Sequence, residues 1–358
     1  MVKKAVKKLL PRSLLDWLQT LRGLIDVYLT IMVSRSQWLS VIYYGLYSSE
    51  FRREMQSVLL ARKHYYKSRT GHSTNTFLLR RNIHRLEKGL IMEPRRTVFA
   101  EGYIEETVES LERCLLAGCL SHAELTWAVA VIRKYFSVVE ATEKVTKSSI
   151  AFQNIVRNLR DVELDSDHVP IAYSELDSID VSFDGFKALC QRRHSVRWFK
   201  AARVPKHLLD AAVNVAATAP SACNRQAFKF YIFDEPDRAR QIGAIPMGTA
   251  GFAHNFQTIV VVVGDLSAYP HEKDRHIIYI DSGLAVMQFQ LALETQGLGS
   301  CVINWPDIER HERQMAAELN LNSYERPVML IAVGYPLAQG RVPYSAKKSA
   351  ADIVVRPG

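Results

Sequence analysis

The chain has 358 residues, and 48% of them are hydrophobic, so it has room for two domains or for one domain with a large extension. Its five cysteines are odd in number, scattered, and without a Cys-x-x-Cys pair. This pattern argues against a disulfide framework or a zinc site and favours a reducing cytoplasm. The sequence contains no helix-turn-helix spacing, ribonucleoprotein aromatic pattern or set of zinc ligands, which argues against nucleic-acid binding.

The net charge of +9 is distributed unevenly along the chain. Residues 1–100 carry 19 Lys and Arg against 6 Asp and Glu, a balance of +13. Residues 101–358 carry 27 Lys and Arg against 31 Asp and Glu, a balance of −4. Because residues 1–100 are basic and residues 101–358 are mildly acidic, we expect the N-terminal part of the chain to bind an anionic surface.

Residues 1–48 form a basic amphipathic segment. Four lysines precede an apolar stretch that is rich in Trp and Tyr and runs over residues 14–47; they are Lys3, Lys4, Lys7 and Lys8. Charged residues interrupt this stretch, so a membrane-spanning helix is not expected, and a signal-peptide cleavage site is absent. Two interpretations stay open: an interfacial helix on anionic lipid, or an ordinary amphipathic helix that packs on the body or on a dimer partner. The expected location is cytoplasmic, with peripheral attachment at the inner face of the membrane as the alternative.

Residues 49–165 are predicted to form a helical extension, because apolar residues recur at helical spacing with few breakers. The expected helices run over about 51–68, 73–89, 98–118, 121–140 and 145–160. An acidic stretch with Pro170 follows, and residues 166–182 are predicted to link the extension to a domain at 183–358.

The C-terminal half alternates helical and extended patterns. Helices are predicted at 183–192, from Pro205 to about residue 216, and at 276–293. Buried or half-buried strands are predicted at 228–233, 259–264, 300–304 and 328–334. Strands separated by helices indicate a central sheet covered by helices.

Two motifs frame the helix that follows Pro205. The first covers residues 192–199, in which Arg193, Ser195 and Arg197 alternate and therefore share one face of an extended backbone. Guanidinium forks and a hydroxyl match phosphate oxygens well. The second covers residues 219–230 and supplies a Pro-Ser turn followed by the amide side chains of Asn224 and Gln226.

Together, these motifs resemble the signature of the nitroreductase-like FMN flavoproteins, an R-x-S-x-(K/R)-x-F entry followed by a helix and a P-S-x-x-N-x-Q turn. Further matches come in the family's order, at residues 281–285, 297–301 and 332–336 and at Lys347-Lys348, so the resemblance extends over about residues 183–355. It implies an α+β, nitroreductase-like flavoprotein fold with a central sheet and helices, preceded here by a mostly helical N-terminal region. It also implies a homodimer.

The resemblance implies which residues hold FMN. The phosphate would be bound by Arg193 and Ser195 together with Lys348 and Lys347 from the tail. Arg197 would lie at the flavin N1–C2=O edge, where a cation favours hydride acceptance.

Two further segments would contact the flavin ring. The first supplies amide partners and a tight backbone wall, largely across the dimer interface: Pro220, Ser221, Asn224 and Gln226. The second is the N5-facing loop around Asn304 and Trp305. Trp305 is predicted either to act as floor or lid of the substrate site or to be an ordinary core tryptophan.

A basic stripe lies at helical spacing in the extension: Arg81, His84, Arg85 and Lys88. It is either a clamp for an acidic ligand or a lid over the flavin site, or it is a solvated basic face that Glu87 partly neutralises.

The function implied is an FMN-dependent oxidoreductase that transfers hydride from NAD(P)H to a small-molecule electron acceptor. A G-x-G-x-x-G fingerprint is absent, so the nicotinamide would bind transiently over the flavin. Two alternatives stay open. One is specialised flavin chemistry on a biosynthetic intermediate, dehalogenation or dehydrogenation, and the other is a membrane-associated flavin-fold scaffold without turnover. No metal is expected.

Overall fold

The computed structural model describes residues 11–71, 75–159 and 168–357, so Lys3, Lys4, Lys7 and Lys8 lie outside the described residues. The contacts group the chain into two compact units, Met1–Gln56 and Ser57–Gly358. The domain boundaries expected from sequence at residues 48, 165 and 182 stay predictions.

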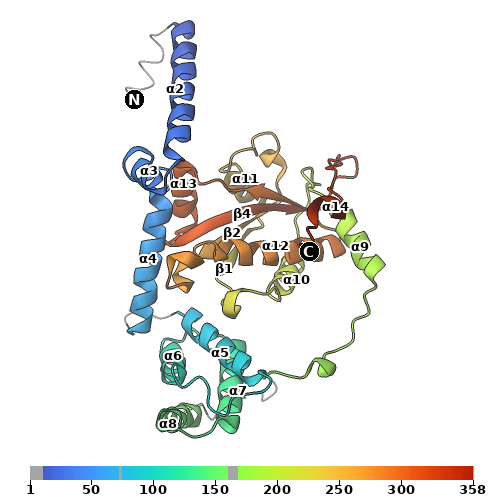
Figure 1. Ribbon diagram of the computed structural model, residues 1–358. Helices are drawn as coiled ribbons and strands as arrows, with labels where there is room; N and C mark the ends of the chain where they lie inside the picture. The colour runs from blue at the N-terminus through green and yellow to red at the C-terminus, as the bar shows by residue number, and fades with distance from the viewer. Residues whose placement is uncertain (1–10, 72–74, 160–167, 358) are drawn as a thin grey trace. The chain divides into compact units, whose positions relative to one another are not determined.

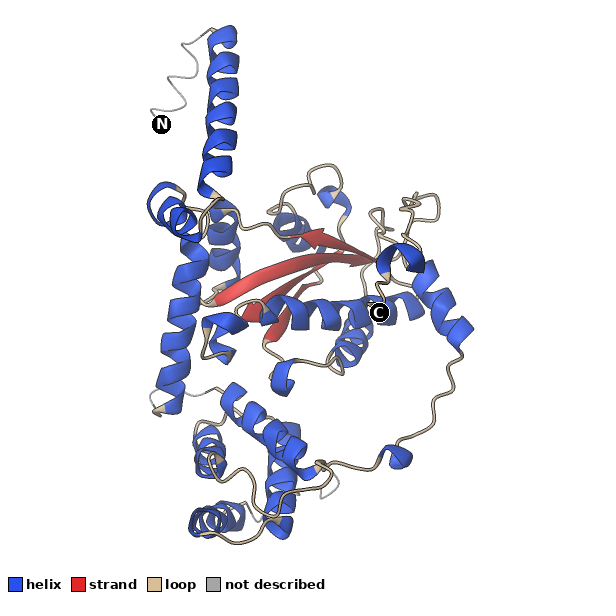
Figure 2. Ribbon diagram, in the orientation of Figure 1, coloured by secondary structure: helices blue, strands red, loops and turns tan. Residues whose placement is uncertain are grey.

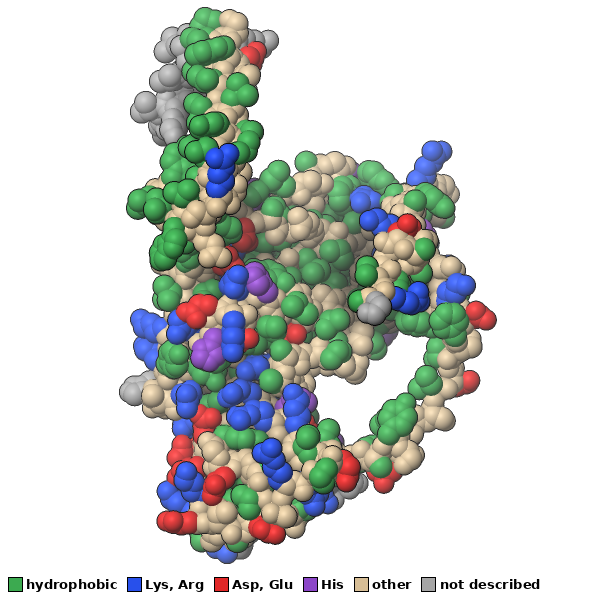
Figure 3. Space-filling view, in the orientation of Figure 1, with side chains coloured by type: hydrophobic (Ala, Val, Ile, Leu, Met, Phe, Trp, Pro, Cys, Tyr) green, Lys and Arg blue, Asp and Glu red, His purple; other side chains and the backbone are tan. Residues whose placement is uncertain are grey.

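The first unit is a succession of exposed helices. Helix α2 spans Arg12–Val33, α3 spans Gln37–Ile42, and a π-helix, η1, spans Tyr43–Tyr47. The apolar stretch is thus broken near Ser36, whose backbone is extended and whose carbonyl accepts hydrogen bonds from the amide and the hydroxyl of Ser40. Hydrophobic side chains cover much of α2, with Trp17 58% and Tyr28 64% exposed (Figure 3). Within the described residues, no helix has the length and apolar character that a membrane crossing requires.

The helical extension begins with α4 (Arg52–Arg69) and continues with α5 (Phe77–Leu90), α6 (Ile104–Leu116), α7 (His122–Val138) and α8 (Glu143–Arg157). All five expected helices are present. The third begins later than expected, because Ala100 has a φ of +59° and turns the chain before the helix. Helices α5 to α8 share one core of buried aliphatic and aromatic side chains that includes Ile83, Leu111 and Tyr135. The C-terminal part of α4 instead packs Val58 and Ala61 into a different cluster, against Leu266 and Ile278.

A four-stranded antiparallel sheet forms the centre of the C-terminal half (Figure 2). Strand β1 spans Phe228–Phe233, β2 Thr258–Asp265, β3 Gly299–Asn304 and β4 Glu325–Gly334. The spatial order is β1-β2-β4-β3, so β1 and β2 are adjacent, as are β3 and β4, and the connection from β2 to β3 passes over β4. All four strands lie where the sequence predicts them.

Helices cover both faces of this sheet, which explains why β2 is apolar at successive positions. On one face, α10 (Lys206–Ala216) and α12 (Ile277–Thr295) pack against Val260 and Val262 (Figure 1). On the other face, α11 (Pro236–Gly243) and α13 (Glu309–Leu319) pack against Val261 and the other β2 side chains that point to that face. Helix α9 (Phe183–Arg192) precedes the first motif, and the short α14 (Ala350–Ile353) lies near the C-terminus. This arrangement confirms the predicted α+β fold, while α11 and α13 were not anticipated.

Candidate functional site

The first motif runs alongside the sheet just after α9. Ser195 forms a parallel bridge with Ser300 in β3, and the Val196 amide donates to the Ser300 carbonyl at 3.0 Å. Gly299 allows this approach, because a Cβ there would lie 2.8 Å from Val196 and 2.9 Å from Pro336. The motif is therefore held against the edge strand β3.

Asn255, which the sequence did not identify, fixes the far end of this motif. Its Nδ2 donates to the Arg197 carbonyl at 2.9 Å, and its Oδ1 accepts from the Phe199 amide at 3.0 Å. Phe199 is buried against Gly334 at the end of β4. An amide side chain thus satisfies two backbone groups that no strand pairs.

A cavity of about 570 Å³ brings the two distant cationic segments together. Arg193 and Ser195 line one side, and Lys347 and Tyr344 from the C-terminal tail line the other. Lys348 is exposed next to this lining. Within the described residues, the side chains of Arg193, Ser195 and Lys347 have no hydrogen bond or ion pair. Two positively charged side chains and one hydroxyl therefore line one cavity, and none of them has a hydrogen-bond or ion-pair partner among the described residues.

Arg197 lies near the same strand on the other side of Val196. Its guanidinium is 5.8 Å from the centre of the Phe252 ring, within cation–π range. Cys301 is buried in β3, and burial raises the pKa of its thiol, although Arg197 and Arg193 oppose this rise. Because its thiol is buried and its pKa is raised, Cys301 is better suited to fill space in the core than to take part in redox chemistry.

Asn304 and Trp305 lie at the end of β3 in different environments. Asn304 is exposed, whereas Trp305 is only 6% exposed and belongs to the core on the α11 and α13 face. The Trp305 Nε1 donates to Glu312 at 2.6 Å, and Glu312 also pairs with the buried Arg326 at 3.2 Å. This placement favours the interpretation of Trp305 as a core tryptophan over that of a floor or lid.

The second motif forms a tight loop between α10 and β1. It contains the 3-10 turn η3 (Ala222–Asn224), and Cys223, Asn224 and Gln226 all have φ near +50°. The Ser221 hydroxyl accepts from the Gln226 amide at 3.1 Å, which closes the turn. Such left-handed backbone costs free energy for residues other than glycine, so the loop needs outside support.

Asp281 in α12 provides part of that support. Its carboxylate accepts from the Ala222 amide at 3.0 Å and from the Tyr269 hydroxyl at 3.3 Å. Burial raises the pKa of Asp281 above the usual range, and these two hydrogen bonds and Arg225 oppose the rise. Asp281 therefore holds the loop.

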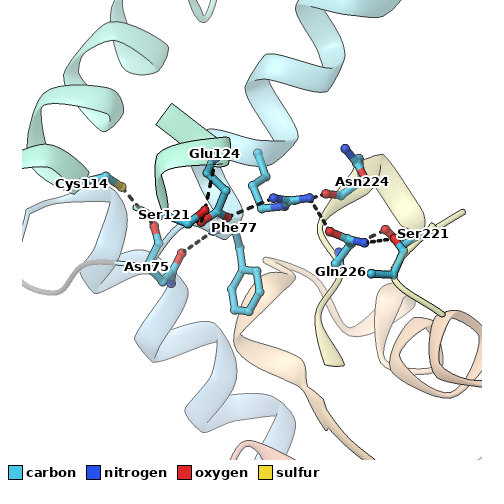
Figure 4. A network of polar contacts seen from close by, with 10 residues as sticks. Asn75, Phe77, Cys114, Ser121, Glu124, Ser221, Asn224 and Gln226 are labelled. Atoms are coloured by element: carbon cyan, nitrogen blue, oxygen red, sulfur yellow. Dashed lines mark hydrogen bonds and ion pairs between the residues drawn. The ribbon is translucent and has the colours of Figure 1, made fainter. Parts of the chain in front are cut away.

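Arg80 in α5 provides the rest of the support, and sequence reasoning missed it. Its Nε donates to the Asn224 carbonyl at 2.9 Å, and its Nη2 donates to the Gln226 Oε1 at 2.6 Å. Glu124 pairs with Arg80 at 3.0 Å, and Figure 4 shows Glu124 on one side of this contact with Asn224 and Gln226 on the other. The Gln226 Nε2 in turn donates to the Ala217 carbonyl. Both ends of the Gln226 amide are therefore engaged within the chain.

Comparison with known proteins decides the family of the C-terminal half. A model described as "Nitroreductase family" matches residues 190–250 and 244–335. Residues 190–335 form a nitroreductase-family domain. Both motifs, the sheet and α12 fall within this domain, which confirms the resemblance seen in the sequence.

Curated relatives of the nitroreductase-family domain include two deiodinases. The chain is 23% identical over 212 residues to iodotyrosine deiodinase of Danio rerio, covering 52% of this chain and 71% of that protein. It is 24% identical over 224 residues to iodotyrosine deiodinase 1 of Sus scrofa, covering 54% of this chain and 76% of that protein.

Solved structures also match the nitroreductase-family domain. An FMN-dependent nitroreductase from Clostridium difficile R20291 is 21% identical, covers 44% of this chain and 91% of its own, and has a TM-score of 0.38. A nitroreductase family protein from Streptococcus pneumoniae TIGR4 is 21% identical, covers 48% of this chain and 100% of its own, and has a TM-score of 0.42.

The basic stripe of α5 lies next to the nitroreductase-family domain, but its four members differ. His84 pairs with Glu87 at 3.0 Å, and Lys88 is exposed. Arg85 lies 3.6 Å from the centre of the Tyr103 ring, and burial lowers the pKa of its guanidinium. Arg81 is half-buried beside it. The stripe is therefore not a uniform solvated face, since Arg85 stacks on Tyr103 and Arg81 is half-buried beside it.

Proposed function

We propose that the nitroreductase-family domain is an FMN-dependent oxidoreductase that takes hydride from NAD(P)H and passes electrons to a small-molecule acceptor. The observation that carries the proposal is the cavity in which Arg193 and Ser195 meet Lys347, from segments more than 140 residues apart. The family match and the FMN dependence named for the Clostridium difficile relative support it.

The residues present fit the phosphate of FMN. Arg193, Ser195 and Lys347 supply fixed positive charge and donors, and no internal partner in the described part of the chain competes for them. The cavity lies beside backbone that Gly299 allows to approach closely, as a tightly bound cofactor requires. Arg193, Ser195, Lys347 and Lys348 would hold the phosphate.

The ring of FMN would lie against the loop that begins at Pro220, largely across the interface of the proposed homodimer. When bound, FMN supplies the hydride-accepting and electron-donating chemistry, so the chain needs no nucleophile of its own. Ser221 and Gln226 close and anchor this loop, Asn224 offers its side-chain amide, and Asn304 lies exposed at the end of β3. Arg197 would supply positive charge at the N1–C2=O edge, and Trp305 would support the loop after β3 from the core.

A second candidate for the reaction is reductive dehalogenation. The observation that favours it is the similarity to two iodotyrosine deiodinases over about half of the chain. The purified protein, reduced by NAD(P)H or by dithionite, would then release halide from a halogenated aromatic substrate faster than it reduces a nitroarene.

The domain would work as a homodimer. Helix α12 exposes an apolar stripe at helical spacing, Ile280, Leu284 and Met287, each more than 40% exposed. This stripe is suited to pair with its own copy across a two-fold axis. Light scattering after size-exclusion chromatography would give twice the mass of 40.7 kDa, and Leu284→Glu would reduce it to the monomer mass.

Residues 1–48 would contact an anionic membrane surface from the cytoplasmic side. The exposed aromatic and aliphatic side chains of α2 and the basic balance of residues 1–100 support this. The full chain would sediment with vesicles that contain phosphatidylserine, and a chain lacking residues 1–48 would not. Sedimentation without flavin binding would instead favour the scaffold alternative.

The test of the central proposal is the colour of the purified protein. We expect a flavin absorbance band, with FMN released on denaturation at one equivalent per chain, and bleaching of the band by NADH or NADPH under anaerobic conditions. A colourless protein that does not bind added FMN contradicts the proposal. A yellow protein that neither nicotinamide bleaches keeps FMN but rejects the hydride donor.

A further inference from the structure

Arg80 connects the helical extension to the nitroreductase-family domain through its guanidinium. It is only 13% exposed, and its three nitrogens point to three partners: Asn224, Gln226 and Glu124. Its guanidinium also lies 5.3 Å from the centre of the Trp127 ring. The planar fork of an arginine reaches such divergent acceptors, whereas a lysine ammonium does not.

The groups that Arg80 satisfies belong to a strained loop. Asn224 and Gln226 both have φ of +50°, and their acceptors lie 144 and 146 positions away from Arg80 in sequence. Phe77, one turn earlier in α5, packs on the same hydrophobic cluster as Ala222 in the loop, a cluster that includes Ala227 just after the loop. Apolar packing and charge-assisted hydrogen bonds therefore act on one short segment, which holds it in a conformation that it would not keep alone.

Glu124 connects this contact to the fold of the extension. Its carboxylate pairs with Arg80 through Oε1, while its Oε2 accepts from Ser121 in the capping box that starts α7. A partly buried arginine that lost this partner would be left with a less compensated charge. The position of Arg80 thus depends on α7, and the loop depends on Arg80.

We propose that Arg80 is a positioning residue that holds the loop of residues 219–226 in its cofactor-binding conformation. The helical extension is then a structural part of the flavin site. This inference rests on the proposed function, since it assigns the loop to the flavin ring. Arg80 itself need not touch the cofactor or the substrate.

The test uses the full chain, prepared with FMN and also stripped of it. In Arg80→Ala, we expect amide hydrogen exchange at residues 221–226 of the stripped protein to become at least tenfold faster, because two charge-assisted hydrogen bonds are lost. FMN should bind about tenfold more weakly, and the flavin absorbance band should shift. Arg81→Ala is the matched control: within the described residues Arg81 makes no hydrogen bond or ion pair with the loop, so the variant should leave exchange and binding as in the wild type.

Two further measurements separate positioning from general stability. Methylguanidinium at a non-denaturing concentration should restore FMN binding to Arg80→Ala and leave Arg81→Ala unchanged. The FMN affinity of Arg80→Lys should lie between those of Arg80→Ala and the wild type, since a lysine keeps the positive charge but not the planar fork of the guanidinium. If Arg80→Ala does not fold, Arg80→Lys decides: weaker FMN binding with an unchanged circular-dichroism spectrum supports the proposal, and wild-type binding overturns it.

The outcomes distinguish this inference from the proposed function. If the wild type binds FMN and Arg80→Ala matches it in exchange, affinity and spectrum, the positioning role is wrong and the flavin assignment stands. If the wild type binds no FMN, the proposed function fails. Faster exchange in Arg80→Ala would then still show that Arg80 holds the loop, and unchanged exchange would refute that as well.

Discussion

The two ends of the candidate site are built in opposite ways. At the phosphate end, the side chains of Arg193, Ser195 and Lys347 surround a cavity and have no hydrogen-bond or ion-pair partner in the described part of the chain. At the ring end, Ser221 and Gln226 are already hydrogen-bonded to the chain itself. The polar side chains at the phosphate end thus have no partner in the described part of the chain, whereas those at the ring end hold the loop in its conformation.

This difference indicates how each end would contribute to binding. Free cations gain hydrogen bonds only when an anion arrives, so the phosphate end would supply most of the affinity. Polar groups that are satisfied internally gain little from a ligand, but they hold the loop backbone in place before the ligand binds. Substitutions at the phosphate end should change the affinity for FMN, and substitutions around the ring end should change the conformation of the loop.

The largest effect is expected at the phosphate end. Arg193→Ala with Lys348→Ala should weaken FMN binding by about two orders of magnitude, because two charge-assisted hydrogen bonds are lost, while the protein stays folded. Fluorescence titration with FMN measures the affinity. Pairing Arg193→Ala with Lys347→Ala identifies the lysine that contributes, since Lys347 lines the cavity and Lys348 lies next to it. Stoichiometric FMN in both double variants would refute the phosphate assignment.

Gly299→Ala should distort the same end without removing a charge. The new Cβ would meet Val196 and Pro336 closer than atoms normally approach, which should destabilise the fold by about 1–3 kcal/mol. Chemical denaturation measures this free energy. Gly102→Ala is the control: the added Cβ meets no atom within 4 Å and lies outside the proposed dimer stripe, so stability should stay equal or rise slightly. Equal stability of the two variants would show that β3 and the motif do not approach as closely as described.

Arg197→Ala should separate binding from reduction. Because Arg197 does not line the cavity of Arg193 and Lys347, FMN affinity should be nearly unchanged. Reduction of the bound flavin by NAD(P)H should slow by about tenfold or more, since a cation would be lost from the edge that becomes anionic. Stopped-flow absorbance gives the rate, and Arg197→Lys should recover part of it. Unchanged reduction kinetics would count against this role.

The smallest effect is expected at Asp281, and it depends on pH. Its folded pKa is raised, chiefly by burial, so the folded state holds this proton more tightly than the unfolded state does. The associated stability is fully present below the unfolded pKa and is lost as pH rises through the folded pKa. Asp281→Asn should flatten this part of the stability–pH curve and keep the hydrogen bond from the Ala222 amide. A curve identical to that of the wild type would mean that Asp281 does not titrate in this window.

The sequence predicted the regular elements wherever local pattern and burial agree. Strand β1 and helix α9 begin and end at the predicted residues, because aromatic and apolar residues dominate the first and Ser182 caps the second. Helices α11 and α13 were missed because they are short and polar, with few apolar residues such as Ile242 and Met315 facing the core. Periodicity is weak evidence when so few positions carry it.

The sequence alone determined the family of the C-terminal half and the order of its motifs, because these are local runs of residue types along the chain. Only the tertiary structure placed Lys347 at the cavity of Arg193, moved Trp305 into the core and brought Arg80 to the loop of Asn224 and Gln226. The physical reason is that a polar side chain is satisfied by any suitable partner that folding brings within about 3 Å. Spacing in the sequence does not specify that partner when it lies more than a hundred residues away.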